Sequence, residues 1–140
     1  MTSIEDTSYN ESLPVDKVGM IAAISKNRAI GKNGEMVWHY PQDFKRFKRL
    51  TEYSTVVMGR ITWQSLPGAP LKNRKNVILS RTPKDEWLSK EHQENPSVVV
   101  VPSLEEALKQ RETDKPLWII GGGTLYKMGL EFADVIDLTY

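Results

Sequence analysis

The chain contains no cysteine and only two histidines, His39 and His92, among its 140 residues. The lack of cysteine excludes disulfide bonds and catalysis by a thiolate. Because the two histidines lie far apart without a nearby pattern of carboxylates, no metal site is expected. Long hydrophobic runs are also lacking, since the longest, such as residues 98–101, are much too short to cross a bilayer. The sequence therefore predicts a soluble, cytoplasmic protein that is not embedded in a membrane.

The chain also lacks a strong excess of charge of either sign. Its formal net charge of +1 gives no reason to expect nucleic acid as a partner. Residues 1–16 hold four acidic side chains and no lysine or arginine, so they carry −4 and residues 17–140 carry +5. The polar, acidic leader is expected to be a loose arm. A basic body suits an anionic ligand, although lysines scattered over solvated helix faces explain the same charge equally well.

Length and composition, with 39% hydrophobic residues, indicate one globular domain with its own core. Short apolar strands alternate with helical segments along that domain. Strands are predicted at residues 18–24, 55–58, 76–80, 97–101, 117–120 and 134–140, and helices at 41–51, 60–66, 84–90, 104–111 and 124–130. This alternation predicts an α/β fold, a single domain with a mostly parallel, twisted sheet flanked by helices.

The helix at residues 104–111 has the clearest start signal in the chain. Ser103 is the expected N-cap, and Glu106 is expected to reach back and complete a capping box.

In a parallel sheet, ligands bind beyond the carboxyl ends of the strands, where Gly59, Ser80 and Gly121 are expected to lie. The Gly121-Gly122-Gly123 run offers bare backbone N–H groups that suit a phosphate, but a tight turn explains it equally well. It is not the G-x-G-x-x-G dinucleotide motif, because Tyr126 stands where the last glycine would be.

Two further segments at strand ends also suit a phosphate, because each has a hydroxyl and a guanidinium: residues 59–62 and the pair Ser80-Arg81. Three such sites suit a dinucleotide better than a mononucleotide. Arg74 could hold an anionic substrate tail, because its planar fork matches a carboxylate. Each of these arginines taken singly is more often just solvated.

Asp43 falls in the first turn of a helix that is expected to start with Pro41 at the N1 position. A carboxylate there stabilises the helix dipole without any catalytic role. In the second interpretation, the neighbouring Phe44 and Phe47 form an apolar face, and burial beside it raises the carboxyl pKa toward a role in proton transfer. Trp38, in the preceding loop, would close that pocket or belong to the core.

Several segments in unbroken order resemble the dihydrofolate reductase family over residues 18–140. They are Ile21-Ala22-Ala23-Ile24, Ile30-Gly31, Met36-Val37-Trp38, Pro41-Gln42-Asp43-Phe44, Val57-Met58-Gly59-Arg60-Ile61-Thr62-Trp63, Leu79-Ser80-Arg81 and Ile120-Gly121-Gly122-Gly123-Thr124-Leu125-Tyr126. The resemblance implies reduction of 7,8-dihydrofolate to tetrahydrofolate, with a hydride from NADPH added to C6 and a proton to N5. It also implies binding of antifolate inhibitors.

The resemblance also assigns roles to individual residues. It implies that Asp43, with Trp38 and Thr139, forms the hydrogen-bonded network that promotes protonation of N5. The residues implied to bind substrate are Ile21, Ala22, Asp43, Phe44, Phe47, Leu66, Arg74, Ile120 and Thr139. Those implied to bind the cofactor are Ala23, Ile30, Gly31, Lys32, Asn33, Gly34, Glu35, Gly59, Arg60, Ile61, Thr62, Leu79, Ser80, Arg81, Gly121, Gly122, Gly123, Thr124, Leu125 and Tyr126.

Compared with the family, the domain at residues 17–140 is expected to be C-terminally shortened and to lack the usual closing hairpin. The strand that begins near Asp134 would then be an unprotected sheet edge, and the protein a monomer or a dimer joined through that edge. Two alternatives stay open. One is a related reductase of another pterin or pyrimidine, and the other is a nonenzymatic module that binds a nucleotide or a protein partner.

Overall fold

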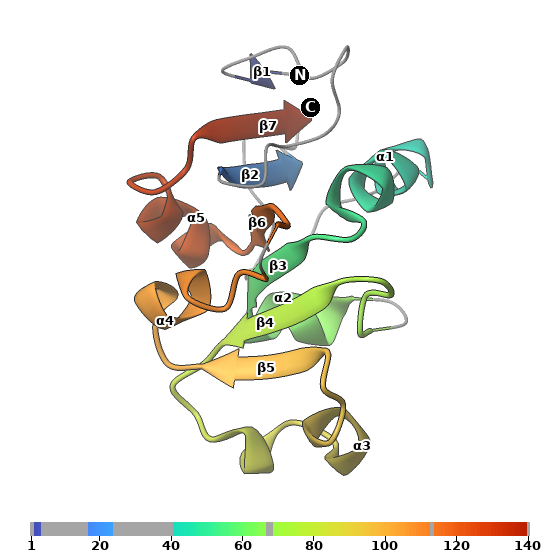
Figure 1. Cartoon of the computed structure of the whole chain (residues 1–140), viewed down its shortest axis with the longest axis vertical. Coiled ribbons are helices and arrows are strands. Elements are labelled where there is room, and N and C mark those ends of the chain that lie inside the picture. The colour runs from blue at the N-terminus through green and yellow to red at the C-terminus, as the bar shows by residue number, and fades with distance from the viewer. Residues whose placement is uncertain (1, 4–16, 24–40, 67–68, 113, 140) are drawn as a thin grey trace.

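The computed structural model describes residues 2–3, 17–23, 41–66, 69–112 and 114–139 (Figure 1). The strands are β1 Thr2–Ser3, β2 Val18–Ala23, β3 Thr55–Gly59, β4 Lys75–Leu79, β5 Val98–Val101, β6 Leu117–Gly121 and β7 Val135–Thr139. The helices are α1 Pro41–Thr51, α2 Arg60–Ser65, the 3₁₀ helix η1 Lys84–Glu86, α3 Lys90–Gln93, α4 Leu104–Leu108 and α5 Gly123–Gly129.

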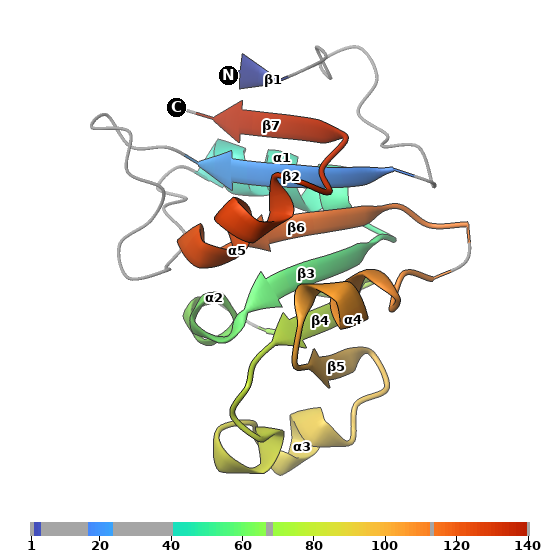
Figure 2. The ribbon, with the colours of Figure 1, turned by 90° about the vertical axis from the view of Figure 1, so that its left-hand side faces the viewer.

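The strands form one sheet in the order β1-β7-β2-β6-β3-β4-β5. Every neighbouring pair from β7 to β5 is parallel, and only β1 runs antiparallel, against β7. The strand directions rotate progressively across the sheet (Figure 1). Helices α1 and α2 lie on one face, α4 and α5 on the other, and α3 lies beyond β5 at the edge (Figure 2). The predicted α/β class with a mostly parallel, twisted sheet is confirmed.

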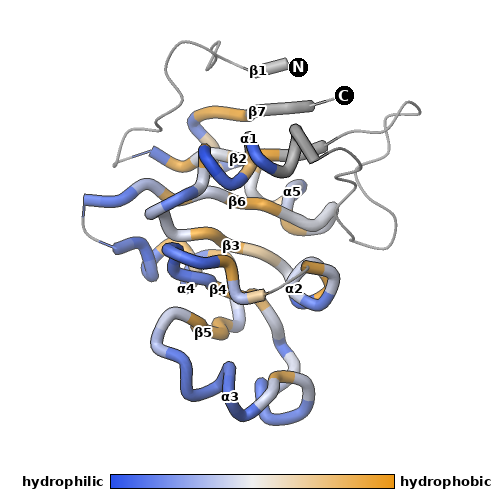
Figure 3. The backbone as a smooth tube through the Cα atoms, turned by 90° about the vertical axis from the view of Figure 1, so that its right-hand side faces the viewer, coloured by the Kyte–Doolittle hydropathy of each residue, from blue (hydrophilic) through white to orange (hydrophobic). Residues whose placement is uncertain are grey.

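Alternate residues of the central strands pack into separate cores on the two faces of the sheet. Met58 and Ile120 face a cluster that includes Phe47 of α1, whereas Val57 and Ile119 face a second cluster on the side of α4 and α5. Figure 3 shows that hydrophobic residues concentrate in the central strands, while α1 is mainly hydrophilic. Burial of apolar area on both faces is therefore what holds the sheet and its helices together.

Two predicted helices differ in the structure. The helix expected at residues 84–90 is two short pieces, η1 and α3, and the side chain of Ser89 caps α3 by accepting the His92 N–H at 3.2 Å. The helix after Ser103 ends at Leu108, earlier than expected.

The predicted capping box is half formed. Ser103 Oγ accepts the Glu106 N–H at 3.2 Å, so Ser103 is confirmed as the N-cap. The Glu106 carboxylate instead contacts Lys109 Nζ at 3.4 Å, because both side chains project from the exposed side of this one-turn helix.

The strand expected to be an unprotected edge is β7, and the structure pairs it with β1. Thr2 lies opposite Leu138 and Ser3 opposite Asp137, so the edge is covered over two residues. At the other end of β7, the Asp134 carboxylate accepts the Val18 N–H at 2.9 Å and fixes the start of β2. The rest of the acidic leader, residue 1 and residues 4–16, lies outside the described residues.

Candidate functional site

A pocket of about 300 Å³ opens where β3, β4 and β6 end. The first turns of α2 and α5 and the turn after β4 complete its walls. Its lining residues are Gly59, Arg60, Ile61, Thr62, Leu79, Ser80, Arg81, Thr82, Gly122, Gly123, Thr124, Leu125 and Met128. The topology thus brings together three segments that lie far apart in the sequence, as expected for a parallel sheet.

Two of these lining residues, Thr82 and Met128, were missed by sequence reasoning. Thr82 simply continues the Ser80-Arg81 segment. Met128 lies one helical turn beyond Thr124, so the i, i+4 spacing within α5 could have identified it. With Ile61, which is 48% exposed, Met128 at 41% gives the pocket apolar side chains that are open to solvent.

The pocket is electropositive. Arg60 is partly exposed and Arg81 is exposed, and none of the described residues that line the pocket is acidic. Within the described part of the chain, neither guanidinium forms an ion pair or a hydrogen bond. Two cations without partners favour an anionic ligand at this site.

The turn that carries Arg81 is held on both sides. The Ser80 N–H donates to the Val101 carbonyl at 2.9 Å, and the Thr82 N–H donates to Ser80 Oγ at 3.1 Å. The Trp87 indole N–H donates to the Thr82 carbonyl at 3.0 Å. These bonds tie the turn to β5 and to the residue that follows η1.

Gly121 and Tyr126, both predicted to contact the cofactor, do not line the pocket but lie behind it. Gly121 has a φ of 144°, and a Cβ on it would lie 3.2 Å from Thr62 Oγ1 and 3.3 Å from the Tyr126 hydroxyl. The buried Tyr126 hydroxyl donates instead to the carbonyls of Ile21 and Ile120, at 2.8 and 2.7 Å. Burial raises the pKa of this phenol above its ordinary value, so it stays protonated and a donor.

Tyr126 spans a gap between two strands. The pairing of β2 with β6 ends at Met20 and Ile119, and the next residues, Ile21 and Ile120, are the ones whose carbonyls the phenol binds. The hydroxyl thus takes the place of the backbone hydrogen bonds between β2 and β6 at the point where the two strands separate. Ile21 and Ile120 themselves belong to the apolar cluster on the face of the sheet that α1 covers.

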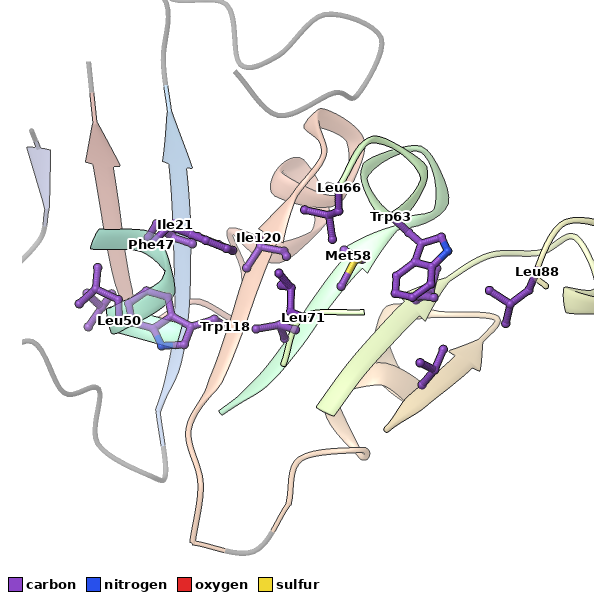
Figure 4. Packing of buried hydrophobic residues seen from close by; sticks show 14 residues of the cluster. Ile21, Phe47, Leu50, Met58, Trp63, Leu66, Leu71, Leu88, Trp118 and Ile120 are labelled. Atoms are coloured by element: carbon purple, nitrogen blue, oxygen red, sulfur yellow. The ribbon is translucent and has the colours of Figure 1, made fainter. Parts of the chain in front are cut away.

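Four of the predicted substrate residues meet on that apolar face. Ile21, Phe47 and Ile120 are fully buried and Leu66 is 8% exposed, and all four belong to the cluster between the sheet and the helices α1 and α2 (Figure 4). The sequence placed them on four different elements, and the structure shows that they share one face.

Arg74 is held rather than solvated. Its Nε donates to Thr51 Oγ1 at 2.9 Å, its Nη2 to the Lys48 carbonyl at 2.8 Å, and its Nη1 to the Lys72 carbonyl. Burial lowers its pKa, and the nearby Glu52 opposes that effect in part. Among the described residues, three of its five N–H groups find acceptors, so one remains on each terminal nitrogen. That pair of donors matches the two oxygens of a carboxylate.

Asp43 is the third residue of α1 and lies in its first turn, as the sequence predicted. The helix begins at Pro41, the expected N1 residue, whose missing N–H costs nothing at that position. The side chains of Asp43, Phe44, Ala22, Ala23 and Thr139 lie outside the described residues. The pairing of the two strands places Ala23 of β2 beside Thr139 of β7.

The remaining predicted site residues lie outside the described residues. They are Ile30, Gly31, Lys32, Asn33, Gly34, Glu35 and Trp38. Among the residues that are described, no group of three or more His, Asp or Glu side chains could hold a metal ion. No helix in the same part of the chain is long and apolar enough to cross a membrane.

Known proteins resemble the chain along most of its length. The family model described as Dihydrofolate reductase matches residues 17–140. Dihydrofolate reductase type 3 of Salmonella typhimurium is 42% identical over 123 residues, which are 88% of this chain and 70% of that protein. Dihydrofolate reductase of Mycobacterium leprae is 41% identical over 124 residues, covering 87% and 70%. That of Buchnera aphidicola subsp. Schizaphis graminum is 36% identical over 124 residues, covering 89% and 71%.

Proposed function

The chain belongs to the dihydrofolate reductase family, and we propose that it uses NADPH to reduce dihydrofolate. In this proposal the cofactor binds in the pocket at the ends of β3, β4 and β6, and the substrate binds at the apolar face that α1 covers. It is a reductase that converts 7,8-dihydrofolate to 5,6,7,8-tetrahydrofolate. The observation that carries the assignment of the site is the electropositive pocket at the carboxyl ends of β3, β4 and β6. It lies next to an apolar face that holds four of the predicted substrate residues.

The pocket fits a nicotinamide dinucleotide that carries a 2′-phosphate. Arg60 and the backbone of Gly122 and Gly123 are assigned to the pyrophosphate, and Ser80 and Arg81 to the 2′-phosphate. Both helices that begin at the pocket are short, so we attribute the attraction for phosphate chiefly to the two guanidinium groups. When bound, NADPH supplies the hydride that is added to C6 of the substrate.

On the substrate side, Ile21, Phe47, Leu66 and Ile120 supply apolar surface for the pterin and aminobenzoyl rings. The two free N–H groups of Arg74 bind the α-carboxylate of the glutamate tail. Because the Thr51 hydroxyl and two backbone carbonyls already fix its orientation, Arg74 loses little freedom when the substrate binds.

We assign proton transfer to Asp43, in the first turn of α1. The same helix packs Phe47 and Leu50 into the core, so its apolar side faces the sheet. A carboxyl group in the first turn of such a helix can donate a hydrogen bond or promote protonation. Asp43 binds the amino and N3 side of the pterin and, with Trp38 and Thr139, promotes protonation of N5.

The first test is oxidation of NADPH, followed by absorbance, when dihydrofolate is added to the purified chain. Asp43→Asn should lower kcat/KM by about 10²–10⁴-fold, because it removes the proton-transfer group and keeps the shape. The matched control is Asp85→Asn in η1, an exposed carboxylate outside the pocket, which should leave kcat/KM unchanged. Full turnover in Asp43→Asn would contradict the role of Asp43.

Family membership favours this function over the nonenzymatic module and over a reductase of another pterin or pyrimidine. NADPH bound without any turnover would reverse that preference. Three further points remain predictions: binding of antifolates at the substrate site, a cytoplasmic location, and a monomer or an edge-strand dimer. Size-exclusion chromatography with light scattering would decide between the two assembly states.

A further inference from the structure

Arg81 is the exposed cation of the pocket, and it sits in a turn of its own between β4 and η1. A long side chain on a surface turn normally loses considerable conformational freedom when it binds a phosphate. Any contact that fixes the backbone on either side of Arg81 would reduce that loss. The structure shows such contacts on both sides.

On the N-terminal side, Ser80 is tied to β5 through the Val101 carbonyl. On the C-terminal side, the Thr82 carbonyl accepts the indole N–H of Trp87 at 3.0 Å. Trp87 is itself anchored, because its backbone N–H donates to the Lys84 carbonyl at 3.2 Å and its ring packs against the cluster that contains Leu88.

We infer that Trp87 is a positioning residue for Arg81 and thereby sets the preference of the pocket for a 2′-phosphorylated dinucleotide. The inference rests on the proposed function, in which Arg81 binds the 2′-phosphate. The indole N–H holds the carbonyl that follows Arg81, so the guanidinium projects toward the pocket before any ligand arrives. An unphosphorylated dinucleotide makes no use of this arrangement, so Trp87 affects the two cofactors differently.

The test measures the dissociation constants of NADP⁺ and NAD⁺ by isothermal titration calorimetry for the wild type and Trp87→Phe. Phenylalanine keeps an aromatic ring in the cluster and removes the N–H. The Kd of NADP⁺ should rise about 2–10-fold, which corresponds to one hydrogen bond, while the Kd of NAD⁺ stays unchanged. The readout is the ratio of the Kd of NAD⁺ to the Kd of NADP⁺, which should fall. Partial unfolding would weaken the binding of both cofactors equally and leave this ratio unchanged.

Two more variants separate the possible outcomes. Arg81→Ala should lower the preference for NADP⁺ further, and adding Trp87→Phe to it should change the ratio no more, because the two residues act as one unit. Trp118→Phe is the matched control, since its buried indole N–H has no hydrogen-bond partner within the described part of the chain, and it should leave the ratio unchanged.

An unchanged ratio in Trp87→Phe, together with a lowered ratio in Arg81→Ala, would overturn the positioning role alone. A lowered ratio in the Trp118→Phe control would also overturn it, because the effect would then not depend on the bond to Thr82. If Arg81→Ala itself leaves the ratio unchanged, the assignment of Arg81 to the 2′-phosphate is wrong, and the inference falls with it.

Discussion

Removing the hydroxyl of Tyr126 should destabilise the protein, because this group joins β2 and β6 where their ladder ends. It is buried and donates to the carbonyls of Ile21 and Ile120, at 2.8 and 2.7 Å. Tyr126→Phe keeps the ring but leaves those two acceptors without the donor, in a place that water does not reach. The expected loss is about 1–3 kcal/mol of unfolding free energy, on the order of 3–10 °C in melting temperature.

Urea unfolding followed by tryptophan fluorescence measures this loss directly. The matched control is Tyr53→Phe, since Tyr53 is 59% exposed and its hydroxyl forms no hydrogen bond within the described residues. The control should change stability by less than about 0.5 kcal/mol. A similarly small change in Tyr126→Phe would refute the argument that the phenol replaces the missing ladder.

Wild type and Tyr126→Phe also test how the contribution of the phenol to stability depends on pH. Burial raises the pKa of Tyr126 above its ordinary value of 10.0. A raised pKa in the folded state means that the contribution of the phenol is complete below pH 10 and is lost as the pH rises toward the folded value. The stability difference between wild type and Tyr126→Phe should therefore be constant near neutral pH and shrink above about pH 10. A difference that grows there would contradict the sign of the shift.

Three further substitutions test the packing and the turns around the site. Gly129→Ala should cost about 1–3 kcal/mol in thermal unfolding, because its Cβ would lie 2.7 Å from Ile119 Cδ1 in the core; a neutral result would mean that α5 moves freely. Asn76→Leu should cost at least about 3 kcal/mol of unfolding free energy, since the buried amide holds the N–H and the carbonyl of Leu71 at 2.9 and 3.0 Å. It should also raise the KM for dihydrofolate, because the loop that follows Leu71 carries Arg74. An unchanged KM would contradict this support of the loop. Ser103→Ala should cost about 0.5–2 kcal/mol in urea unfolding through loss of the N-cap, and no loss would show that α4 forms without it.

The sequence by itself determined the class of the fold and the edge of the sheet at which the site forms. Apolar, β-branched strands such as Val98–Val101 alternate with helical segments, and that alternation leaves few arrangements other than a parallel sheet. Parallel strands end at one edge, so Gly59 and Ser80 could be placed in the same pocket without knowledge of any contact. Element boundaries were less certain, as the division of residues 84–93 into η1 and α3 shows.

Only the tertiary structure decided which side chains face the pocket and which support it from behind. The sequence predicted Tyr126 as a cofactor contact, but its hydroxyl binds a carbonyl 105 residues away. The sequence predicted that Arg74 either holds an anionic tail or is solvated, but the structure shows three of its N–H groups donated to residues up to 26 positions distant. The bond from Trp87 to Thr82 and the pairing of β1 with β7 left no pattern in the sequence. Hydrophobic periodicity is a local property and fixes the faces of an element, whereas a hydrogen bond between distant residues depends on where the completed core places both partners.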